Sequence, residues 1–319
     1  MVALLDRVLS ATSCAEAFLL SHQGADGLWR DYDLEPGQSE GWTTAFVGWA
    51  VAQPPSSVAV PPALDRAKAT LHLIRTPAGW GYNRHTAADA DSTAWVWRLL
   101  AVLDDYRGVP AATSLSTFLT ENGAARTFLS EDRFGSWAWE HADVTPVVGL
   151  ALLAVGAKQD VVDEVRRAVL AAYAPGSGWK AFWWATDVYA NSQSLEFLAA
   201  TGSIPEHILE DLRNWAITTG AHPTAFETAH HVAIMLDLGL CDHPLARDLV
   251  ESLLSTQNDD CSWPASPLLL GPGQREVGPR ELLGNADSQR LITTATVLCS
   301  LKKWLLSSRD ISAFRQPPS

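Results

Sequence analysis

The sequence predicts an all-α fold: a single-domain (α/α)6 barrel built from six helix-pair repeats over residues 1–319. A marker made of a small residue followed by Trp recurs along the chain, and a Thr- or Ser-based marker recurs in phase with it. A pair of short helices cannot bury its apolar face alone, whereas stacked pairs bury a continuous core. Neither end of the chain resembles a polar capping repeat, which favours closure of the six pairs into a ring.

The chain contains 14 tryptophans, an unusually large number, and five of them form the first marker. Its members are Trp29, Trp80, Trp137, Trp179 and Trp263, separated by 51, 57, 42 and 84 residues. The last interval is twice 42, so one repeat lacks its marker, and the mean spacing is about 47 residues. We predict that these five tryptophans pack between helices as structural residues.

The second marker opens each apolar helical stretch with a hydroxyl residue. Its members are Thr44, Thr93, Thr145, Ser192, Thr228 and Thr294. Thr228 lies where the Trp marker is missing, so both markers give six repeats. The stretches that follow, such as residues 93–103, 144–155 and 294–306, have apolar residues at mixed three-and-four spacing, which predicts helices.

Composition and charge argue against several classes of function. The net charge is -13 with no run of Lys or Arg, so a nucleic-acid partner is not expected. The longest apolar stretch, residues 144–157, contains Pro146 and is shorter than the ~20 residues of a membrane-spanning helix, so no integral membrane segment is expected. Four cysteines without C-x-x-C spacing predict neither a disulfide framework nor a structural zinc site, and favour a cytoplasmic location.

Three motifs carry a resemblance to a known family. The segment Asp89-Ala90-Asp91-Ser92-Thr93-Ala94 is similar to the D-x-D-D-T-A motif of class II terpene cyclases such as squalene-hopene cyclase. Gln23-x-x-Asp26-Gly27-x-Trp29 and Gln257-x-x-Asp260-Cys261-Ser262-Trp263 resemble the QW motifs of triterpene cyclases. Protein prenyltransferase β subunits share the barrel, so the QW motifs specify fold more than chemistry. The resemblance covers nearly the whole chain at the level of the repeats, and it implies that Asp91 is the general acid of a protonation-initiated cyclisation.

The chain departs from this family in two ways. Ser92 stands where the motif has a third Asp. Class II cyclases usually enclose their substrate between two helical domains, whereas this chain holds only one. Either another element completes the chamber, such as an inserted loop, a second copy of the chain in a homodimer or a partner subunit, or the reaction differs.

The register of the repeats predicts a cluster of polar residues beside the acid. Asp89 and Asp91 neighbour His141 and Asp143 at adjacent helix starts, if the repeats are equivalent. Like charges and an apolar cavity raise the pKa of a carboxyl group, which keeps it protonated at neutral pH and so available as a proton donor. The resemblance assigns His141 the role of donating a hydrogen bond to the acid, and an ordinary core or surface histidine is an equal alternative. Ser92 is a further candidate hydrogen-bond partner of the acid or of its proton source. Helix capping is an equal alternative for Asp89 and Asp143.

Aromatic residues are candidates for a wall that stabilises a carbocation, because aromatic faces attract cations without offering a nucleophile. These candidates are Trp42, Trp95, Trp97, Trp183, Trp184, Tyr189 and Phe226. The pair Trp183-Trp184 has no counterpart in the other repeats, which favours a functional role for it.

The last repeat contains an insertion over residues 264–289, rich in Pro and Gly, which we predict to be a lid. Arg290, together with Arg275 and Arg280, is a candidate for binding a diphosphate, and Mg²⁺ would then accompany the substrate. Protonation itself requires no cofactor. Arg84, His85 and Lys180 are weaker candidates, for which solvated surface charge is the simpler account.

The sequence therefore predicts a class II terpene cyclase that acts on a hydrophobic polyprenyl or prenylated small molecule. Two alternatives stay open: a cyclase or isomerase of a non-terpene polyene on the same fold, and a non-catalytic isoprenoid-binding subunit of a heteromeric cyclase. A zinc site of the prenyltransferase kind is not expected. Asp259-x-Cys261 matches its pattern, but no histidine follows His243 in the chain.

Overall fold

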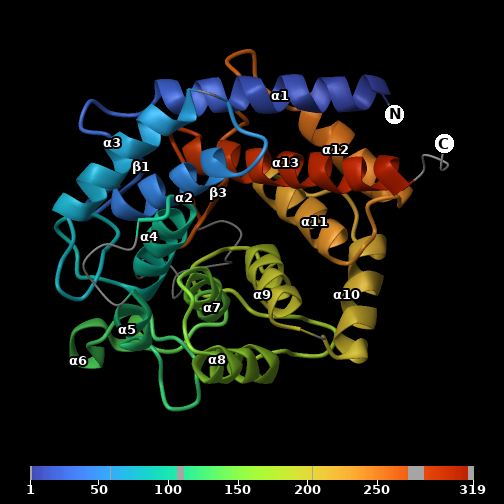
Figure 1. Cartoon of the computed structure of the whole chain (residues 1–319). Helices are drawn as coiled ribbons and strands as arrows, with labels where there is room; N and C mark the ends of the chain where they lie inside the picture. The colour runs from blue at the N-terminus through green and yellow to red at the C-terminus, as the bar shows by residue number, and fades with distance from the viewer. Residues whose placement is uncertain (1, 58, 106–110, 203, 272–283, 315–319) are drawn as a thin grey trace.

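The computed structural model describes residues 2–57, 59–105, 111–202, 204–271 and 284–314. Among these residues, six helices contact one another in a closed cycle, and the last helix of the cycle packs against the first. In chain order they are α2 (Gly41–Ala52), α4 (Ala90–Val102), α7 (Thr145–Ala154), α9 (Val188–Thr201), α11 (Ala225–Asp237) and α13 (Leu291–Phe314). Figure 1 shows these inner helices arranged around a common centre.

A second set of helices covers the outside of this cycle, each packed against an inner helix. They are α1 (Val2–Ser21), α3 (Val60–Leu73), α5 (Ala111–Ser116), α8 (Gln159–Ala171), α10 (Glu206–Thr218) and α12 (Pro244–Ser255). A short helix, α6 (Glu131–Phe134), and a 3-10 turn over Gly135–Ala138 lie in the connection before α7. No helix in the described ranges is both long and apolar enough to cross a bilayer.

The inner helices are buried on most sides, whereas the outer helices are buried on one face only. In the inner helix α2, ten of twelve residues are buried, because this helix is covered on all sides. In the outer helix α8, the buried residues Val162, Val165 and Val169 form one stripe at i, i+3 and i+7, and the rest of the helix faces solvent.

The two sequence markers meet through hydrogen bonds. The backbone N–H of Trp29 donates to Thr44 Oγ1 at 2.9 Å, and its indole N–H donates to the carbonyl oxygen of Leu19 at 2.6 Å. The same pair of bonds recurs at Trp80 with Thr93 and Leu71, and at Trp263 with Thr294 and Leu253. In the fourth repeat the prediction of Ser192 was wrong by one residue, because the Trp179 backbone N–H donates to Asn191 Oδ1 at 3.3 Å while its indole N–H donates to the Val169 carbonyl. Each of these tryptophans joins the end of an outer helix to the start of the next inner helix, which confirms their structural role.

The prediction for Trp137 was wrong. In its repeat, the backbone N–H of Ala125 donates to Thr145 Oγ1 at 3.0 Å, so residues 123–125 take the place of the Gly-Trp step. Gly123 has a φ of 83°, in the left-handed region that Gly adopts without strain. Trp137 lies in the 3-10 turn, half-buried, with its ring 6.2 Å from that of Trp183.

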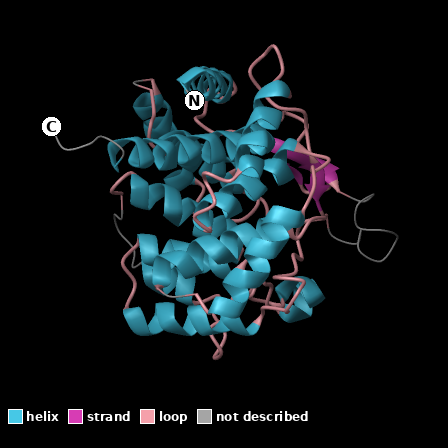
Figure 2. Cartoon of the chain, turned by 90° about the vertical axis from the view of Figure 1, so that its right-hand side faces the viewer, coloured by secondary structure: helices cyan, strands magenta, loops and turns pink. Residues whose placement is uncertain are grey.

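Two small antiparallel strand pairs lie on one side of the helices (Figure 2). The first pairs β1 (Asp31–Leu34) with β2 (Gly37–Ser39), and the second pairs β3 (Pro267–Leu269) with β4 (Asn285–Ala286). The second pair belongs to the predicted insertion, and it is tied to the segment before α9. There, the Leu270 N–H donates to the Trp183 carbonyl and the Ala185 N–H donates to the Leu268 carbonyl, both at 2.8 Å. Arg275 and Arg280 lie outside the described residues.

Cys14 of α1 and Cys261 form a disulfide, with their Cα atoms 5.3 Å apart. The prediction that the cysteines form no disulfide was wrong for this pair. The two residues are 247 positions apart in the sequence, and they meet because closure of the helix cycle brings α1 beside the last repeat. Cys241 and Cys299 are free thiols.

Candidate active site

Two adjoining cavities lie near the N-terminal ends of α2, α4 and α9. The inner cavity, of about 100 Å³, is lined by Trp42, Tyr82, Asp89, Asp91, Ser92, Thr127, Phe128, Trp183, Trp184 and Leu269. The outer cavity, of about 710 Å³, shares Tyr82, Phe128, Trp183 and Leu269 with it. These shared side chains form the boundary between the two cavities. Six of the residues predicted from the sequence thus line one small space.

Asp91 lies in the first turn of α4, at the wall of the inner cavity. Its Oδ1 is buried and lacks a well-aligned hydrogen-bond donor among the described residues. Burial, followed by the charges of Asp89 and Asp143, raises the pKa of Asp91 well above its ordinary value. The nearby Trp42 indole N–H and the Arg98 guanidinium offset this rise only in part. The arrangement favours a carboxylic acid that keeps its proton at neutral pH.

Asp89 caps α4 and also lines the inner cavity. Its Oδ1 accepts a hydrogen bond from the Ser92 backbone N–H at 2.7 Å, and its Oδ2 accepts one from the Ser92 hydroxyl at 2.8 Å. The prediction that Ser92 is a partner of Asp91 was therefore wrong, because its hydroxyl is directed to the capping carboxylate. Burial raises the pKa of Asp89 to about 7.

Asp143 and His141 contact the segment that contains Phe182 and Trp183. Asp143 Oδ2 accepts hydrogen bonds from the backbone N–H groups of Phe182 and Trp183, at 2.8 Å and 2.7 Å. The His141 ring stacks on the Phe182 ring, with 3.6 Å between centroids. Asp143 thus positions Trp183 and adds a negative charge near the acid. A direct hydrogen bond from His141 to Asp91 stays a prediction.

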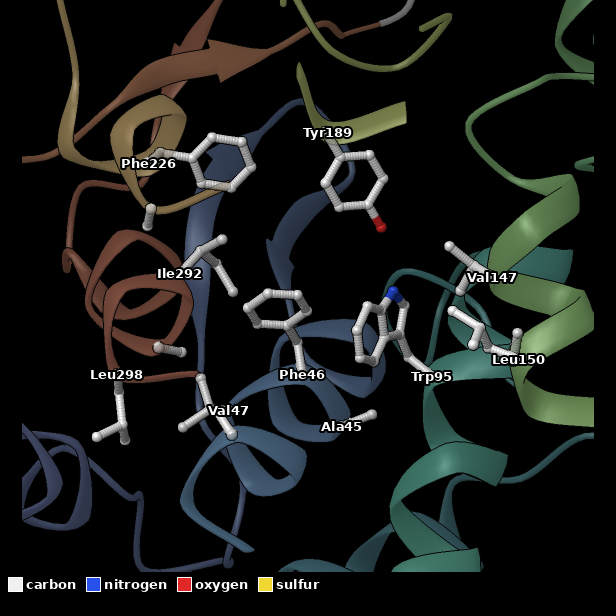
Figure 3. Close-up of a cluster of buried hydrophobic side chains, with 14 of the residues drawn as sticks. Ala45, Phe46, Val47, Trp95, Val147, Leu150, Tyr189, Phe226, Ile292 and Leu298 are labelled. Carbon is white, nitrogen blue, oxygen red and sulfur yellow. The ribbon is translucent and has the colours of Figure 1, made fainter. Parts of the chain in front are cut away.

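The aromatic residues form layers behind the inner cavity. Trp42, Trp183 and Trp184 line it. Phe226 stacks on Trp184 with 4.8 Å between ring centroids, and Tyr189 lies equally close to Trp184. Figure 3 shows Tyr189 and Phe226 together in this second layer, with the Tyr189 hydroxyl directed toward the Trp95 indole nitrogen.

Trp95 and Trp97 differ from their predicted role. The Arg98 guanidinium lies over the Trp95 ring, 4.2 Å from its centroid, so one face of the ring already holds a cation. A second positive charge on the opposite face would be repelled by the first, so Trp95 is a poor site for stabilising a carbocation. Trp97 packs edge-on against Trp80, 5.4 Å away, as part of the helix packing.

The prediction that Arg290 binds substrate was wrong. Arg290 Nη1 donates to Asp260 Oδ2 and to Ser262 Oγ, both at 2.8 Å, and its guanidinium lies over the Phe18 ring. These contacts hold the side chain against the loop of the last repeat and α1, away from the residues that line either cavity. Arg84 and Lys180 also have acidic partners, Glu40 and Asp187 respectively.

Several residues of the site could not be predicted from the sequence. Tyr82, Thr127, Phe128 and Leu269 line the inner cavity, and Phe128 stacks on Phe134 of the outer cavity with 4.2 Å between ring centroids. Tyr82, Thr127 and Phe128 come from loops and Leu269 from the short strand β3 of the insertion, where no helical period or repeated marker predicts side-chain direction. Within the described ranges, no group of three or more His, Cys, Asp or Glu side chains is arranged to hold a metal ion.

Neither a protein-family model nor a curated protein matches this sequence. Several solved structures match it. The type II terpene cyclase MstE from Scytonema, in its apo form, matches with a TM-score of 0.80 and 25% identity over 95% of this chain and 99% of that chain. The chain has the fold of a type II terpene cyclase. A variant of MstE in complex with geranylgeranyl dihydroxybenzoate, described as its substrate, matches with a TM-score of 0.81 and 24% identity, over 96% of this chain and all of that chain.

Two further structures share this type II cyclase fold. A protein from Actinoplanes matches with a TM-score of 0.78 and 28% identity over 93% of this chain and 99% of that chain. The ent-copalyl diphosphate synthase from Streptomyces platensis matches with a TM-score of 0.61 and 18% identity. This match covers 82% of the present chain and half of the synthase, which is a longer protein.

Proposed function

We propose that this chain is a class II terpene cyclase, built on an (α/α)6 barrel, in which Asp91 protonates the terminal alkene of a prenylated substrate. The observation that carries the proposal is a buried carboxylic acid in the wall of a small, aromatic-walled cavity. Similarity to MstE, which is solved both with geranylgeranyl dihydroxybenzoate and with its product merosterolic acid A, supports a prenylated substrate.

The shape of the site supports entry of the substrate with its prenyl tail first. The acid lines the inner cavity, whereas the outer cavity is larger and has polar residues, Asp33, Glu35, His85 and Arg133, in its lining. The outer cavity lies within the range of about 300–1,000 Å³ that is common for small-molecule sites. The apolar tail would therefore lie against Trp42 and Trp184, with the head group in the outer cavity.

The reaction would begin with transfer of the Asp91 proton to the terminal alkene, whose π electrons form the new C–H bond. The carbocation on the neighbouring carbon would then be attacked by the next double bond, which closes a ring. The faces of Trp42 and Trp184 would stabilise the cation by about 0.5–2 kcal/mol each. Loss of a proton or capture of water ends the sequence. No step requires a cofactor, and Mg²⁺ would enter only with a diphosphate substrate.

The inserted loop would close the chamber that a second domain closes in larger cyclases. Leu269, Leu270, Gly271 and Asn285, from the described parts of the insertion, line the outer cavity. This placement favours a wall supplied by the chain itself over one supplied by a homodimer or a partner subunit.

Incubation of the purified protein with a panel of substrates tests this function. The panel comprises farnesyl and geranylgeranyl diphosphates, the farnesyl and geranylgeranyl dihydroxybenzoates, and squalene, each with and without Mg²⁺. We expect a cyclised product with the mass of its substrate, or of its substrate plus water, from at least one prenylated compound. Binding of these compounds without turnover would instead support the non-catalytic subunit.

The turnover rate is expected to fall as pH rises. Only the protonated form of Asp91 supplies the proton. Because the pKa of Asp91 is raised, this form is lost at a higher pH than for an ordinary carboxyl group. Above about pH 7, ionisation of Asp89 adds a negative charge that holds the Asp91 proton more firmly and weakens it as an acid. Measured from about pH 5 to about pH 10, kcat should be level on the acid side and then fall about tenfold per pH unit. A rate that rises with pH over this range would contradict a general acid.

A further inference from the structure

A third cavity, of about 270 Å³, lies among the inner helices, and we call it the rear cavity. Helices α2, α4, α9, α11 and α13 line it. Its lining includes Gln53 at the C-terminal end of α2, whereas the inner cavity includes Trp42 at the N-terminal end of the same helix. The two cavities therefore lie toward opposite ends of α2.

Most of the rear-cavity lining is apolar, but several polar side chains contribute to it. They include Ser192, Gln193, Glu196, His230, Ser300 and Lys303. The Nε2 atom of His230 is buried and has no hydrogen-bond partner among the described residues. Burial lowers the pKa of His230 to about 3, so the ring is neutral at neutral pH.

Water would satisfy the buried, unpartnered Nε2 atom of His230. Buried polar atoms in proteins are nearly always hydrogen-bonded, to ordered water where no protein group is available. A water molecule takes about 30 Å³ of liquid volume, so the rear cavity has room for several.

A single layer of aromatic rings separates the rear cavity from the rings that line the inner cavity. Phe46 lines the rear cavity and stacks on Trp42 of the inner cavity, with 5.5 Å between ring centroids. Phe226 stacks on Trp184 of the inner cavity and lies edge-on to His230 of the rear cavity, at 4.8 Å and 4.6 Å. Tyr189 makes the same kind of bridge between Trp184 and His230. Figure 3 shows Phe46, Tyr189 and Phe226 converging in this layer.

We infer that Phe46, Tyr189 and Phe226 form a barrier that keeps the water of the rear cavity away from the carbocation, and that this barrier directs the reaction to end by proton loss. The inference rests on the proposed function. With the barrier closed, a C–H bond next to the cation breaks, its electrons form a C=C bond, and the proton passes to a carboxylate of the Asp89–Asp91 pair. With the barrier open, a water oxygen bonds to the cationic carbon and loses a proton to a second water, which gives an alcohol.

Truncation of Phe46 tests the barrier. In H₂¹⁸O, Phe46→Ala is expected to raise the fraction of ¹⁸O-labelled alcohol at least about tenfold over that of the wild type. Phe118→Ala is the matched control, because it truncates a buried Phe that lines none of the three cavities, and it should keep the parent product. Phe46→Leu opens the aromatic layer less than Phe46→Ala does, and it replaces the alanine variant in this test if that variant does not fold. Turnover by a folded Phe46 variant with no rise in labelled alcohol would overturn the inference.

A second substitution identifies the source of the water. Ala233 lines the rear cavity, so Ala233→Leu should fill part of it and lower the alcohol fraction of the Phe46 variant several-fold. An unchanged alcohol fraction in the double variant would mean that the water comes from the outer cavity, and would overturn the inference.

The hydration of the rear cavity can also be determined by crystallography, independently of enzyme activity. A crystal structure of the wild-type protein should show ordered water within hydrogen-bond distance of His230 Nε2. A dry rear cavity would overturn the inference even in an active cyclase. An inactive protein with a hydrated rear cavity would instead count against the proposed function alone.

Discussion

Asp91→Asn is expected to lower the rate of cyclisation by about 100-fold to 10,000-fold, the range for loss of a general acid. Asparagine has nearly the shape of aspartic acid, but its amide is too weak an acid to protonate an alkene. The rate is measured as initial product formation by mass spectrometry, and circular dichroism and thermal unfolding should match those of the wild type.

Asp160→Asn is the matched control for this variant. Asp160 lies in the first turn of α8, so the substitution makes the same chemical change at another helix start, on an exposed outer helix. Its rate should equal that of the wild type. If Asp91→Asn kept more than about a tenth of the activity, another group would have to supply the proton.

Lys302→Met is expected to lower the free energy of unfolding by about 3–5 kcal/mol, the range for breaking a buried ion pair. Lys302 Nζ lies 2.7 Å from Glu16 Oε1, and the two side chains are only 1% and 5% exposed. The same ammonium donates to the carbonyl oxygens of Val51 and Gln53 at the end of α2, at 3.1 Å and 2.7 Å. The substitution leaves the Glu16 carboxylate buried without its cation, at the point where α1, α2 and α13 close the ring.

Two variants separate this effect from a general loss of charge on α13. Lys303→Met removes the neighbouring lysine, which pairs with Asp237, and should cost less than Lys302→Met because this ammonium is 35% exposed and water can partly replace it. The double variant Glu16→Gln/Lys302→Met should recover part of the loss, because it removes the stranded charge. Urea unfolding, followed by circular dichroism, gives the free energy of unfolding of the wild type, the two single variants and the double variant. A Lys302→Met protein as stable as Lys303→Met would contradict this account of ring closure.

The helix cycle was predictable because its sequence markers are physically coupled. A tryptophan backbone N–H bonds to the hydroxyl of the Thr that opens the next inner helix, so both residues recur together. The same logic explains the error at Trp137, where a small residue precedes a Trp in a loop without this bond. The disulfide between Cys14 and Cys261 could not be read from spacing, because it depends on how the two ends of the cycle meet.

The site was predictable where the helix register determines side-chain direction. Asp89 and Asp91 follow from the repeat and the motif. Trp95 lies one turn further along α4 than Asp91, and Arg98, three residues on, covers its face, so it lies deeper than expected. Arg290 was misassigned because its partners, Asp260 and Ser262, are 30 and 28 positions earlier in the sequence. Phe128 comes from a loop and Leu269 from a short strand of the insertion, and the path of both segments depends on tertiary contacts such as the pairing of the insertion with residues 183–185.

Turnover in D₂O tests the central claim most directly. If Asp91 starts the reaction by protonating the terminal alkene, its carboxyl proton exchanges with solvent before each turnover and is delivered to carbon. The cyclised product should then carry one deuterium on the carbon that was the terminal alkene CH, with no such label in unreacted substrate. A cyclised product without deuterium at that carbon would contradict protonation as the first step, and with it the role of Asp91.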